Sequence, residues 1–431
     1  MSRMVLKNGL VIDPSQNLKQ IADIRIENGL VAEIGTGLHG EQELDLTGLA
    51  VFPGLVDMHV HFRDPGLTYK EDIFSGCRAA AAGGVTSVAC MPNTRPTVDT
   101  PETVRYIVDK ASHADAHVYP VAAITKGLSG VEMTDFAALK AAGAVGVSDD
   151  GRPVENAAMM QRALELADRS QMKIISHCED LAIIDGGIVN EGKISRALGV
   201  KGMHRSSEDS VTAREIALAA ATGTAIHIAH VSTKGSVALI RDAKARGVRV
   251  TAETAPHYFM LTDELLFKRD ADYRMNPPLR EQEDCDAVLE GVLDGTLDCI
   301  VTDHAPHAPE EKADFEKAPN GVVGLETSFA ACMTALVQTG KLSISGLIER
   351  MSLNPARLLG IRAGSLAVGM PADIAAADLN ERWAVDVDRL HSKSRNSVFK
   401  GMTLQGKIKY TLLNGRLVYK DNGLERKADA E

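Results

Sequence analysis

The sequence has no long hydrophobic run. No stretch reaches about 18 apolar residues without interruption, the length that a membrane-spanning helix needs. The N-terminal segment MSRMVLKNGLVIDP also lacks the apolar centre of a signal peptide. We therefore expect a cytoplasmic protein that has no membrane partner.

Paired cysteines are missing too. The six cysteines are scattered without a CxxC pair, and several lie in apolar runs. We predict buried, reduced thiols rather than disulfides or zinc-thiolate sites. These residues are Cys77, Cys90, Cys178, Cys285, Cys299 and Cys332.

The sequence also has no excess of positive charge. The chain carries 47 Lys and Arg against 58 Asp and Glu, a net charge of -11, which makes nucleic acid an unsuitable partner. An anionic small substrate is still compatible, because local cations override net charge inside a cleft. The 431 residues are 45% hydrophobic and 24% charged, as in an ordinary globular protein. This length accommodates a barrel of about 250 residues with an attached domain.

Both ends of the chain have the pattern of short strands. Segments such as MVLKNGLVIDP and KIKYTLLNGRLVYKDNG alternate between apolar and polar residues. Asn-Gly pairs predict turns at Asn8-Gly9, Asn28-Gly29 and Asn414-Gly415. We expect residues 1–52 and 362–431 to build one small β-sandwich domain together.

Residues 53–361 have a different pattern, in which short apolar runs alternate with helix-like stretches. This alternation predicts eight strands with intervening helices, an α/β fold of the (β/α)₈ or TIM-barrel type. An open doubly wound sheet is the alternative, but no Gly-rich dinucleotide motif follows the first strand. The predicted strands are LVDMHVH, VTSVACMPNT, AHVYPVAAIT, GAVGVSDDG, KIISHCED, AIHIAHVS, VRVTAETAPHY and DCIVTDHAPH.

The first of these strands ends in two histidines, His59 and His61. Side chains at i and i+2 of a strand point to the same face, so both imidazoles can bind one ion. Four further strands also end in potential ligands, and barrel enzymes place their chemistry at the carboxyl ends of the strands. These candidates are Asp149 or Asp150, His177, His230, and Asp303 with His304.

Each candidate alone could instead cap a helix or form an internal hydrogen bond. Together, however, these carboxylates and imidazoles would be electrostatically costly at one rim without a cation. Four histidines and two aspartates exceed the ligand number of one tetrahedral zinc ion, so we predict a two-metal centre with a bridging carboxylate. The ligand types leave zinc, manganese and cobalt open. Such a centre predicts metal-assisted hydrolysis of a carbonyl compound, or its reverse.

Polar residues next to these ligands are candidates for holding a substrate. Arg63 follows the histidine pair and suits a carboxylate, and Asn93 can donate beside it. Alternatively, Arg63 could pair with Asp64 or Asp72, and Asn93 could cap a turn. Together the pattern predicts a substrate that bears a carboxylate.

Further candidates follow the last two strands. Asn276 and His307 lie beyond strands seven and eight, where they too could contact the substrate. Glu253 and His257 lie near the end of strand seven, and the sequence leaves open whether they support the site or only pack.

The motifs together resemble the dihydroorotases of the amidohydrolase superfamily, in the bacterial class that includes the longer chains. The resemblance covers essentially the whole chain and is carried by motifs in the family's order. They are HVHFRDPG, MPNTRPTVD, SDDGRPV, MNPPLR, TDHAPH, EEKADFEKAPNGVVGLET and GMPADI. It implies a (β/α)₈ barrel with a small β-domain made by both termini.

The resemblance also implies a ligand set for two zinc ions. His59 and His61 would bind one ion, which Asp303 completes, and His177 and His230 would bind the other. Asp150, the second Asp of SDDG, would bridge the two ions together with a hydroxide.

Substrate contacts follow from the same resemblance. Arg63, Asn93 and His307 would hold the substrate carboxylate, with His61 close to the substrate as well. Asn276 and the backbone at Gly321 and Val322 would contact the pyrimidine ring. Residues 305–320 look like a mobile loop over the site.

The implied reaction is the reversible cyclisation of N-carbamoyl-L-aspartate to dihydroorotate, a step of pyrimidine biosynthesis. In the hydrolytic direction the bridging hydroxide would attack the ring carbonyl. Asp303 would accept its proton and pass it to the departing nitrogen, as a carboxylate shuttle can. We also expect a homodimer and consider association with aspartate transcarbamoylase.

Two other functions compete with this interpretation. Hydantoinases, dihydropyrimidinases and allantoinases share the barrel and the histidine pair, but they generally bridge their metals with a carboxylated lysine. Here strand four ends in SDD, and the nearest upstream lysine, Lys140, lies in the preceding predicted helix. A non-catalytic partner subunit is the second alternative, but the chain keeps every ligand position that the motifs match.

Overall fold

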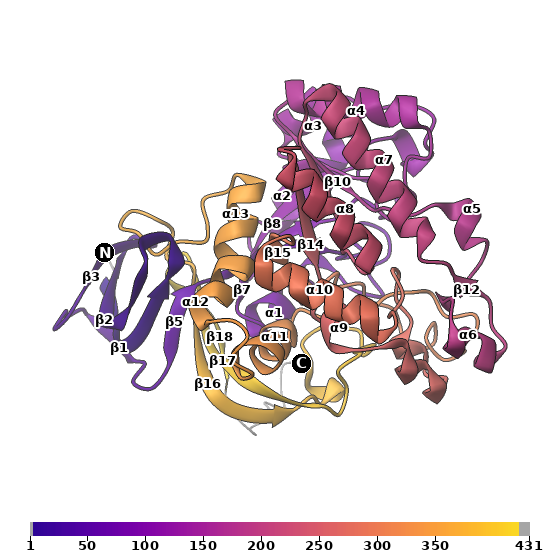
Figure 1. The fold of residues 1–431 in the computed structure, drawn as a ribbon. Coiled ribbons are helices and arrows are strands. Elements are labelled where there is room, and N and C mark those ends of the chain that lie inside the picture. The colour runs from indigo at the N-terminus through magenta and orange to yellow at the C-terminus, as the bar shows by residue number, and fades with distance from the viewer. Residues whose placement is uncertain (1–2, 422–431) are drawn as a thin grey trace.

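A closed ring of parallel strands forms the centre of the molecule. The computed structural model describes residues 3–421, and Figure 1 shows their arrangement. The eight strands follow one another in the order β6-β7-β8-β9-β10-β13-β14-β15, each hydrogen-bonded to the next. The (β/α)₈ prediction is therefore confirmed. The strands are β6 (Leu55–Val60), β7 (Val85–Cys90), β8 (His117–Ala122), β9 (Gly146–Val147), β10 (Lys173–Ser176), β13 (Ile226–Ile228), β14 (Val250–Thr254) and β15 (Cys299–Ile300).

Contacts between β6 and the residues after β15 close the ring. Val60 forms a parallel bridge with His304, and the His61 N–H donates to the His304 carbonyl at 2.8 Å. The buried Asp57 carboxylate adds to this closure, since it accepts hydrogen bonds from the Thr302 N–H at 3.1 Å and the Thr302 hydroxyl at 2.6 Å. The first and last strands are thus joined where the predicted ligands begin.

Helices cover the outside of the ring, and side chains at their N-termini define where several of them begin. Asp72 and Ser75 form a capping box on α1, and Thr100, Asn156 and Thr233 cap α2, α4 and α8. The helices of the barrel are α1 (Ile73–Ala82), α2 (Pro101–Ala111), α3 (Phe136–Ala142), α4 (Ala157–Arg169), α7 (Ser206–Thr222), α8 (Lys234–Ala245), α9 (Pro256–Met260), α10 (Gln282–Asp294), α11 (Ser328–Cys332), α12 (Ile344–Ile348) and α13 (Asn354–Leu359). Between β10 and α7 the chain adds α5 (Leu181–Ile184), β11 (Val189–Asn190), α6 (Lys193–Leu198) and β12 (Gly202–Met203).

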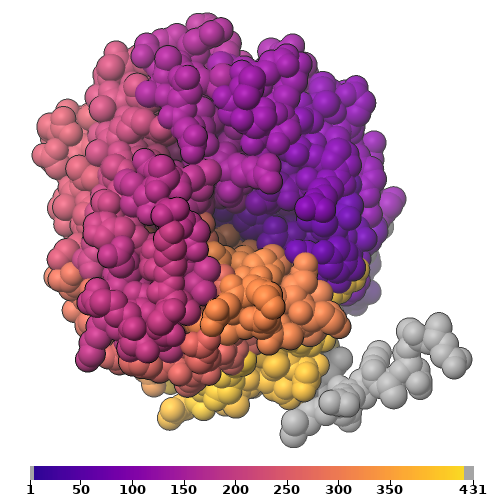
Figure 2. Space-filling view, turned by 90° about the vertical axis from the view of Figure 1, so that its right-hand side faces the viewer, coloured from indigo at the N-terminus to yellow at the C-terminus, as the bar shows by residue number. Residues whose placement is uncertain are grey.

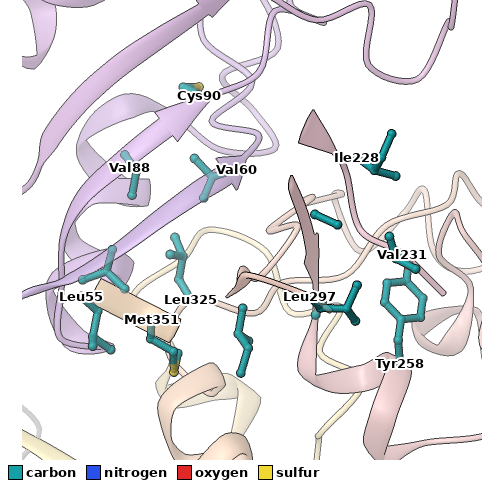
Figure 3. Close-up of a cluster of buried hydrophobic side chains, with 14 of the residues drawn as sticks. Leu55, Val60, Val88, Cys90, Ile228, Val231, Tyr258, Leu297, Leu325 and Met351 are labelled. Atoms are coloured by element: carbon teal, nitrogen blue, oxygen red, sulfur yellow. The ribbon is translucent and has the colours of Figure 1, made fainter. Parts of the chain in front are cut away.

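Apolar side chains fill the space between strands and helices. Val60, Val88 and Ile228 belong to different strands, and all three are fully buried in one large cluster (Figure 3). A second cluster contains Met58 and Leu359, and so places α13 against the barrel strands. This packing makes the strand ends a rigid support.

The terminal segments form one sheet, with strand order β18-β17-β16-β5-β1-β2-β3 and β4 paired to β1. The β-sandwich domain predicted from both termini is present as one additional sheet, to which both ends of the chain contribute strands. β5 spans the predicted boundary at residue 52, and α13 ends just before the one at 361. The strands are β1 (Arg3–Asp13), β2 (Leu18–Glu27), β3 (Leu30–Gly35), β4 (Gln42–Asp45), β5 (Ala50–Pro53), β16 (Ile374–Ala384), β17 (Thr403–Leu413) and β18 (Arg416–Lys420).

Two of the three predicted Asn-Gly turns are present. Asn28-Gly29 joins β2 to β3, and Asn414-Gly415 joins β17 to β18. The turn predicted at Asn8-Gly9 is wrong, because both residues lie inside β1. Asn8 has φ +61°, and the pairing of β1 with β2 shifts register between Leu6 and Gly9, so the same dipeptide forms a β-bulge.

Two predictions about composition can also be compared with the structure. All six cysteines are buried and unpaired, as predicted. Within residues 3–421, no helix has both the length and the apolar character required to cross a bilayer.

The bulge at Asn8 gives a stability prediction. Asn8→Val should lower the free energy of unfolding by about 1–2 kcal/mol, because a β-branched residue tolerates positive φ poorly. Asn8→Gly is the matched control and should change it by less than about 0.5 kcal/mol, since glycine adopts this backbone freely. Urea denaturation measures both, and equal stability of the two variants would contradict the bulge.

Candidate metal centre

The predicted metal ligands meet at the carboxyl end of the barrel. This face is hollowed at its centre, and the hollow is bordered by segments from the first half of the chain and by the region after β15 (Figure 2). The structure brings together all six predicted side chains, each buried and each from the end of a barrel strand. They are His59, His61, Asp150, His177, His230 and Asp303.

The Asp150 carboxylate lies at the centre of this cluster. Its oxygens are 3.3 Å from His59 Nε2 and 3.5 Å from His61 Nε2, His177 Nδ1 and His230 Nε2. Asp303 closes one side, with Oδ1 at 3.2 Å from His61 Nε2 and 3.7 Å from His59 Nε2. We name these six residues the rim cluster.

The donor atoms of the rim cluster fit divalent cations. Two groups of three have their ligand atoms within 4.8 Å of one another: His59, His61 and Asp150, and Asp150, His177 and His230. Asp150 belongs to both. His59 Nε2 and Asp150 Oδ1 are buried and find no hydrogen-bond partner within residues 3–421, although they face each other. This orientation suits atoms that bind a common cation better than atoms that bind each other.

Electrostatics lead to the same conclusion. Burial opposes charge on His177, but Asp150 and Glu179 outweigh it and raise the pKa of His177 to about 10. Burial likewise opposes charge on Asp150, yet the adjacent imidazoles of His177, His230 and His59 hold the pKa of Asp150 well below its usual range. The cluster therefore requires positive charge, which either protons or metal ions can supply.

The structure distinguishes the paired aspartates at the end of β9. Asp149 turns away from the rim and accepts hydrogen bonds from the N–H groups of Ile124 and Thr125 at 2.7 and 3.0 Å. Only Asp150 joins the cluster. His304 is likewise outside it, since its Nε2 lies 3.4 Å from Glu71 and its Nδ1 accepts from the Gly324 N–H.

Two buried glutamates hold the outer nitrogens of the ligand histidines. Glu253 Oε1 lies 2.6 Å from His59 Nδ1, and its Oε2 lies 3.1 Å from His227 Nε2. Glu179 Oε2 lies 3.1 Å from His177 Nε2. Each carboxylate fixes one ring so that its other nitrogen faces Asp150. The sequence left the roles of Glu253 and His257 open. In the structure Glu253 orients His59. His257 instead packs against Tyr258, and its Nε2 has no hydrogen-bond partner within residues 3–421.

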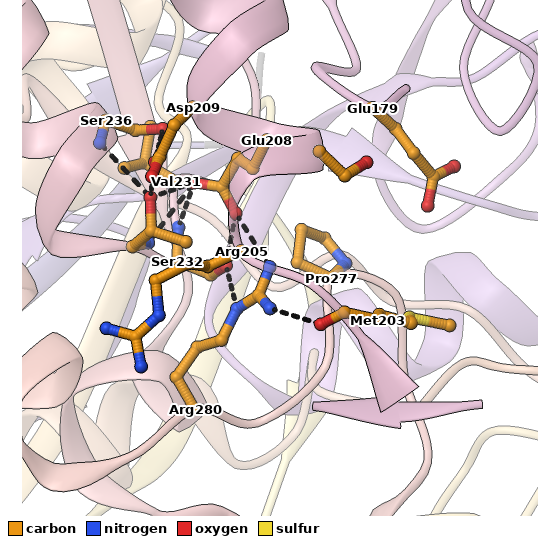
Figure 4. Close-up of polar contacts among 12 residues, drawn as sticks. Glu179, Met203, Arg205, Glu208, Asp209, Val231, Ser232, Ser236, Pro277 and Arg280 are labelled. Atoms are coloured by element: carbon orange, nitrogen blue, oxygen red, sulfur yellow. Dashed lines mark hydrogen bonds and ion pairs between the residues drawn. The ribbon is translucent and has the colours of Figure 1, made fainter. Parts of the chain in front are cut away.

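A second network fixes the turn that follows His230. The Ser232 N–H donates to Glu208 Oε1 at 2.9 Å, and Arg280 Nε donates to the Ser232 hydroxyl at 3.1 Å (Figure 4). Arg280 also reaches the Met203 carbonyl at 3.4 Å. His230 itself has φ +31°, a conformation rare for a residue with a side chain, so the network holds this ligand in a strained backbone.

Arg63 lies beside the rim cluster and does not use the two structural partners considered for it. Its Nε donates to the Pro306 carbonyl at 3.2 Å. Asp64 instead pairs with Lys110 and Asp72 with Lys393. Within residues 3–421, no carboxylate forms an ion pair with the buried Arg63 cation, so this position suits an anionic ligand.

His307 faces Arg63, with its Nε2 3.5 Å from Arg63 Nη2 and 2.9 Å from the Asn320 carbonyl. Lys70, which the sequence analysis did not select, lies 3.2 Å from His307 Nδ1 and 2.8 Å from Glu311. Burial, together with the charges of Arg63, Lys70 and Lys312, lowers the pKa of His307 to about 2. A neutral imidazole therefore stands among cations, where a carboxylate would be attracted.

The two predicted asparagines also lie beside the cluster. Asn93 Oδ1 is 2.8 Å from His61 Nδ1, and its Nδ2 is 3.4 Å from Asp150. Asn276 Nδ2 donates to Glu179 at 2.9 Å, so it shares that glutamate with His177.

The backbone at Gly321 and Val322 lies next to Ala305 and His307. Gly321 has φ +145°, and a Cβ there would lie 2.9 Å from His307 Nε2, so this position requires glycine. The Gly321 N–H already donates to Arg274 and its carbonyl accepts from Lys312 and Asn396. The ring contact at this position stays a prediction.

Comparisons with known proteins agree with the family resemblance of the sequence motifs. Residues 48–236 match a family model described as dihydro-orotase-like. A curated dihydroorotase from Geobacter metallireducens is 50% identical over 422 residues, which is 97% of this chain and 99% of the relative. A dihydroorotase from Acetivibrio thermocellus is 49% identical over 425 residues, 98% of this chain and 100% of the relative.

Solved structures of related barrels superimpose closely. An L-hydantoinase from Arthrobacter aurescens has a TM-score of 0.88 at 26% identity, covering 99% of this chain and 98% of its own. A D-hydantoinase from Bacillus sp. AR9 has a TM-score of 0.86 at 26% identity, covering 97% and 95%.

The bond between Glu253 and His59 predicts an effect on metal affinity. Glu253→Gln keeps the size of the side chain but removes its charge, so the dissociation constant for zinc should rise by about 10–100-fold. Competition with a chromophoric chelator measures it. Cys299→Ala changes a buried side chain close to Glu253 but no member of the rim cluster, so it is the control. Unchanged affinity in Glu253→Gln would refute the orienting role.

Metal removal should destabilise the protein. Restoring zinc to about 100 times its dissociation constant should stabilise the metal-depleted chain by about 2.7 kcal/mol, because the ion binds the folded state only. Thermal denaturation measures the shift. Asp150→Asn should lose most of it, and an equal zinc response in that variant would argue against the rim cluster as the site.

Proposed function

Because the chain belongs to the dihydroorotase family, we propose that its rim cluster binds two zinc ions and that Asp150 bridges them. The family makes the chain a cyclic amide hydrolase, which interconverts dihydroorotate and N-carbamoyl-L-aspartate in pyrimidine biosynthesis. The observation that supports two ions is the Asp150 carboxylate, which faces four imidazole nitrogens and belongs to both ligand groups.

The ligand sets divide along the two sides of Asp150. His59, His61 and Asp303 would hold one ion, since Asp303 lies near both histidines of that side. His177 and His230, whose nitrogens are 2.9 Å apart, would hold the other. When bound, two divalent cations supply a Lewis acid for the substrate carbonyl and a water molecule of lowered pKa.

Asp303 is the group that we propose moves the proton. Burial opposes its charge, but the hydrogen bond from His61 and the charges of His59 and His230 lower the pKa of Asp303, so it begins as a carboxylate. In hydrolysis its Oδ takes the proton of the water that adds to the ring carbonyl carbon. It then delivers this proton to the ring nitrogen as the C–N bond breaks. In cyclisation it removes the proton from the attacking nitrogen and delivers it to the departing oxygen.

The substrate would be oriented by polar groups that lie beside the rim cluster. Arg63, Asn93 and His307 would hold its carboxylate, and Asn276 with the backbone at Gly321 and Val322 would contact the ring. The buried guanidinium of Arg63 and the neighbouring Lys70 supply the positive charge for this end.

A hydantoinase-type site is the second candidate, because solved hydantoinases share the fold. Such a site needs a lysine at the position of the bridging ligand. Lys140 is exposed on α3 and donates to the Gln171 carbonyl at 2.5 Å, so it is not part of the rim cluster. Asp150 occupies the centre instead. Mass spectrometry that detected a carboxylated lysine would overturn the bridging role of Asp150.

We further propose that the chain forms a homodimer in the cytoplasm and can associate with aspartate transcarbamoylase. Its complete set of ligand side chains favours an active enzyme over a scaffold. Gel filtration of the purified chain with and without the transcarbamoylase tests both associations.

The proposed proton transfer by Asp303 predicts that its substitution reduces turnover but not metal binding. Asp303→Asn should bind metal nearly as the wild type does but lower turnover by about 10²–10⁴-fold, since the amide cannot shuttle a proton. A spectrophotometric assay of dihydroorotate hydrolysis, with metal-depleted and zinc-restored protein, measures it alongside metal content. Near-normal turnover in the variant would eliminate the assignment, and an inactive zinc-restored wild type would eliminate the proposed function.

The carboxylate contact predicts a change in KM. Arg63→Met keeps much of the stem but removes the guanidinium, so KM for dihydroorotate should rise by about 10–100-fold because a charge-assisted pair is lost. Arg105→Met, on the outer face of α2 and paired with Glu102, is the control and should leave KM unchanged. A wild-type KM in Arg63→Met would mean that another group binds the carboxylate.

A further inference from the structure

We propose that Asn396, contributed by the C-terminal domain, is a positioning residue that holds His307 for the substrate carboxylate. The inference rests on the proposed function, because it concerns how that substrate is bound. Asn396 lies far from the barrel motifs in the sequence, yet the residue is only 2% exposed and its side chain contacts the backbone of His307.

Three hydrogen bonds use the polar atoms of this side chain. Its Oδ1 accepts from the His307 N–H at 3.3 Å. Its Nδ2 donates to the Ala305 carbonyl at 3.2 Å and to the Gly321 carbonyl at 2.9 Å. The Asn396 carbonyl accepts from the Val323 N–H at 3.0 Å as well.

These bonds join the two ends of the loop over the site. The loop leaves the barrel at Ala305 and returns at Gly321 and Val322, where the Ala305 N–H donates to the Val322 carbonyl at 2.7 Å. Asn396 bridges both ends and also bonds to the backbone of His307 itself. It therefore fixes the backbone from which the His307 side chain extends toward Arg63.

The rest of the segment is held by other contacts. The Ser394 hydroxyl donates to the Lys70 carbonyl at 2.8 Å, and Lys393 pairs with Asp72 at 2.5 Å. The segment should therefore stay docked when only the Asn396 side chain is changed. This separates an effect on His307 from loss of the domain contact.

The first experiment compares two variants of one segment. Asn396→Asp keeps the shape and an acceptor for His307 but removes both donated bonds, so it should raise KM for dihydroorotate about tenfold, with kcat changed less than about threefold. Ser397→Ala removes a hydroxyl that accepts from the Phe399 N–H within the segment, and it should leave KM unchanged. Zinc content and melting temperature are measured on each. If Asn396→Asp does not fold, Asn396→Ser is assayed in its place.

A double-mutant cycle tests whether Asn396 changes KM through His307. If Asn396 acts through His307, its substitution should change KM by less than about twofold in a His307→Ala background. A full tenfold effect in that background would overturn the proposal, as would a wild-type KM in the single variant. Lost zinc content or an equal effect of Ser397→Ala would also overturn it. All of these outcomes presuppose an active wild type, whereas an inactive zinc-restored wild type would instead reject the proposed function.

Discussion

A buried carboxylate among four imidazoles is the constraint on which the site depends. Parallel strands of a closed barrel end at one rim, so Asp150 and the histidines are brought together there. Positive charge stabilises such a buried group, and so do hydrogen-bond partners for the outer ring nitrogens. Glu253 and Glu179 are such partners for His59 and His177, whereas His230 Nδ1 has none among residues 3–421. The inner geometry of the site therefore follows from an outer layer of buried acids.

The opposite side of the pocket is built differently. There the polar groups come from segments that join the barrel from outside: the loop with His307, the turn with Lys70 and the C-terminal segment with Asn396. Arg63, directly after β6, is the link between the two sides. In the proposed function, metal ligands on strand ends and substrate contacts on loops divide rigidity and adaptability between two parts of one site.

Much of this arrangement could be predicted from the sequence. Alternating apolar runs gave the barrel, and polar residues at strand ends identified five members of the rim cluster, although they also suggested His304. At strand four the position left Asp149 and Asp150 open, and only the family resemblance selected Asp150. Glu253 could not be assigned, because its partner His59 is remote in the chain and no local pattern signals such a pair. Asn8 was misread because the same Asn-Gly dipeptide suits a turn or a bulge, and only the partner strand decides between them. Asn396 gave no signal for the same reason, since every bond of its side chain is to remote backbone.

The terminal sheet has a consequence for biosynthesis. β5 is paired on one side with β1 and on the other with β16, so that Val51 lies opposite Ala376. While the ribosome is still making the barrel, the edge of β5 therefore has no partner strand. The N-terminal strands can complete their sheet only after nearly the whole chain has emerged, which makes this a high-contact-order step late in folding. A truncation that removed β16 would leave an unpaired strand edge directly beside the first barrel strand, where association with other nascent chains is favoured.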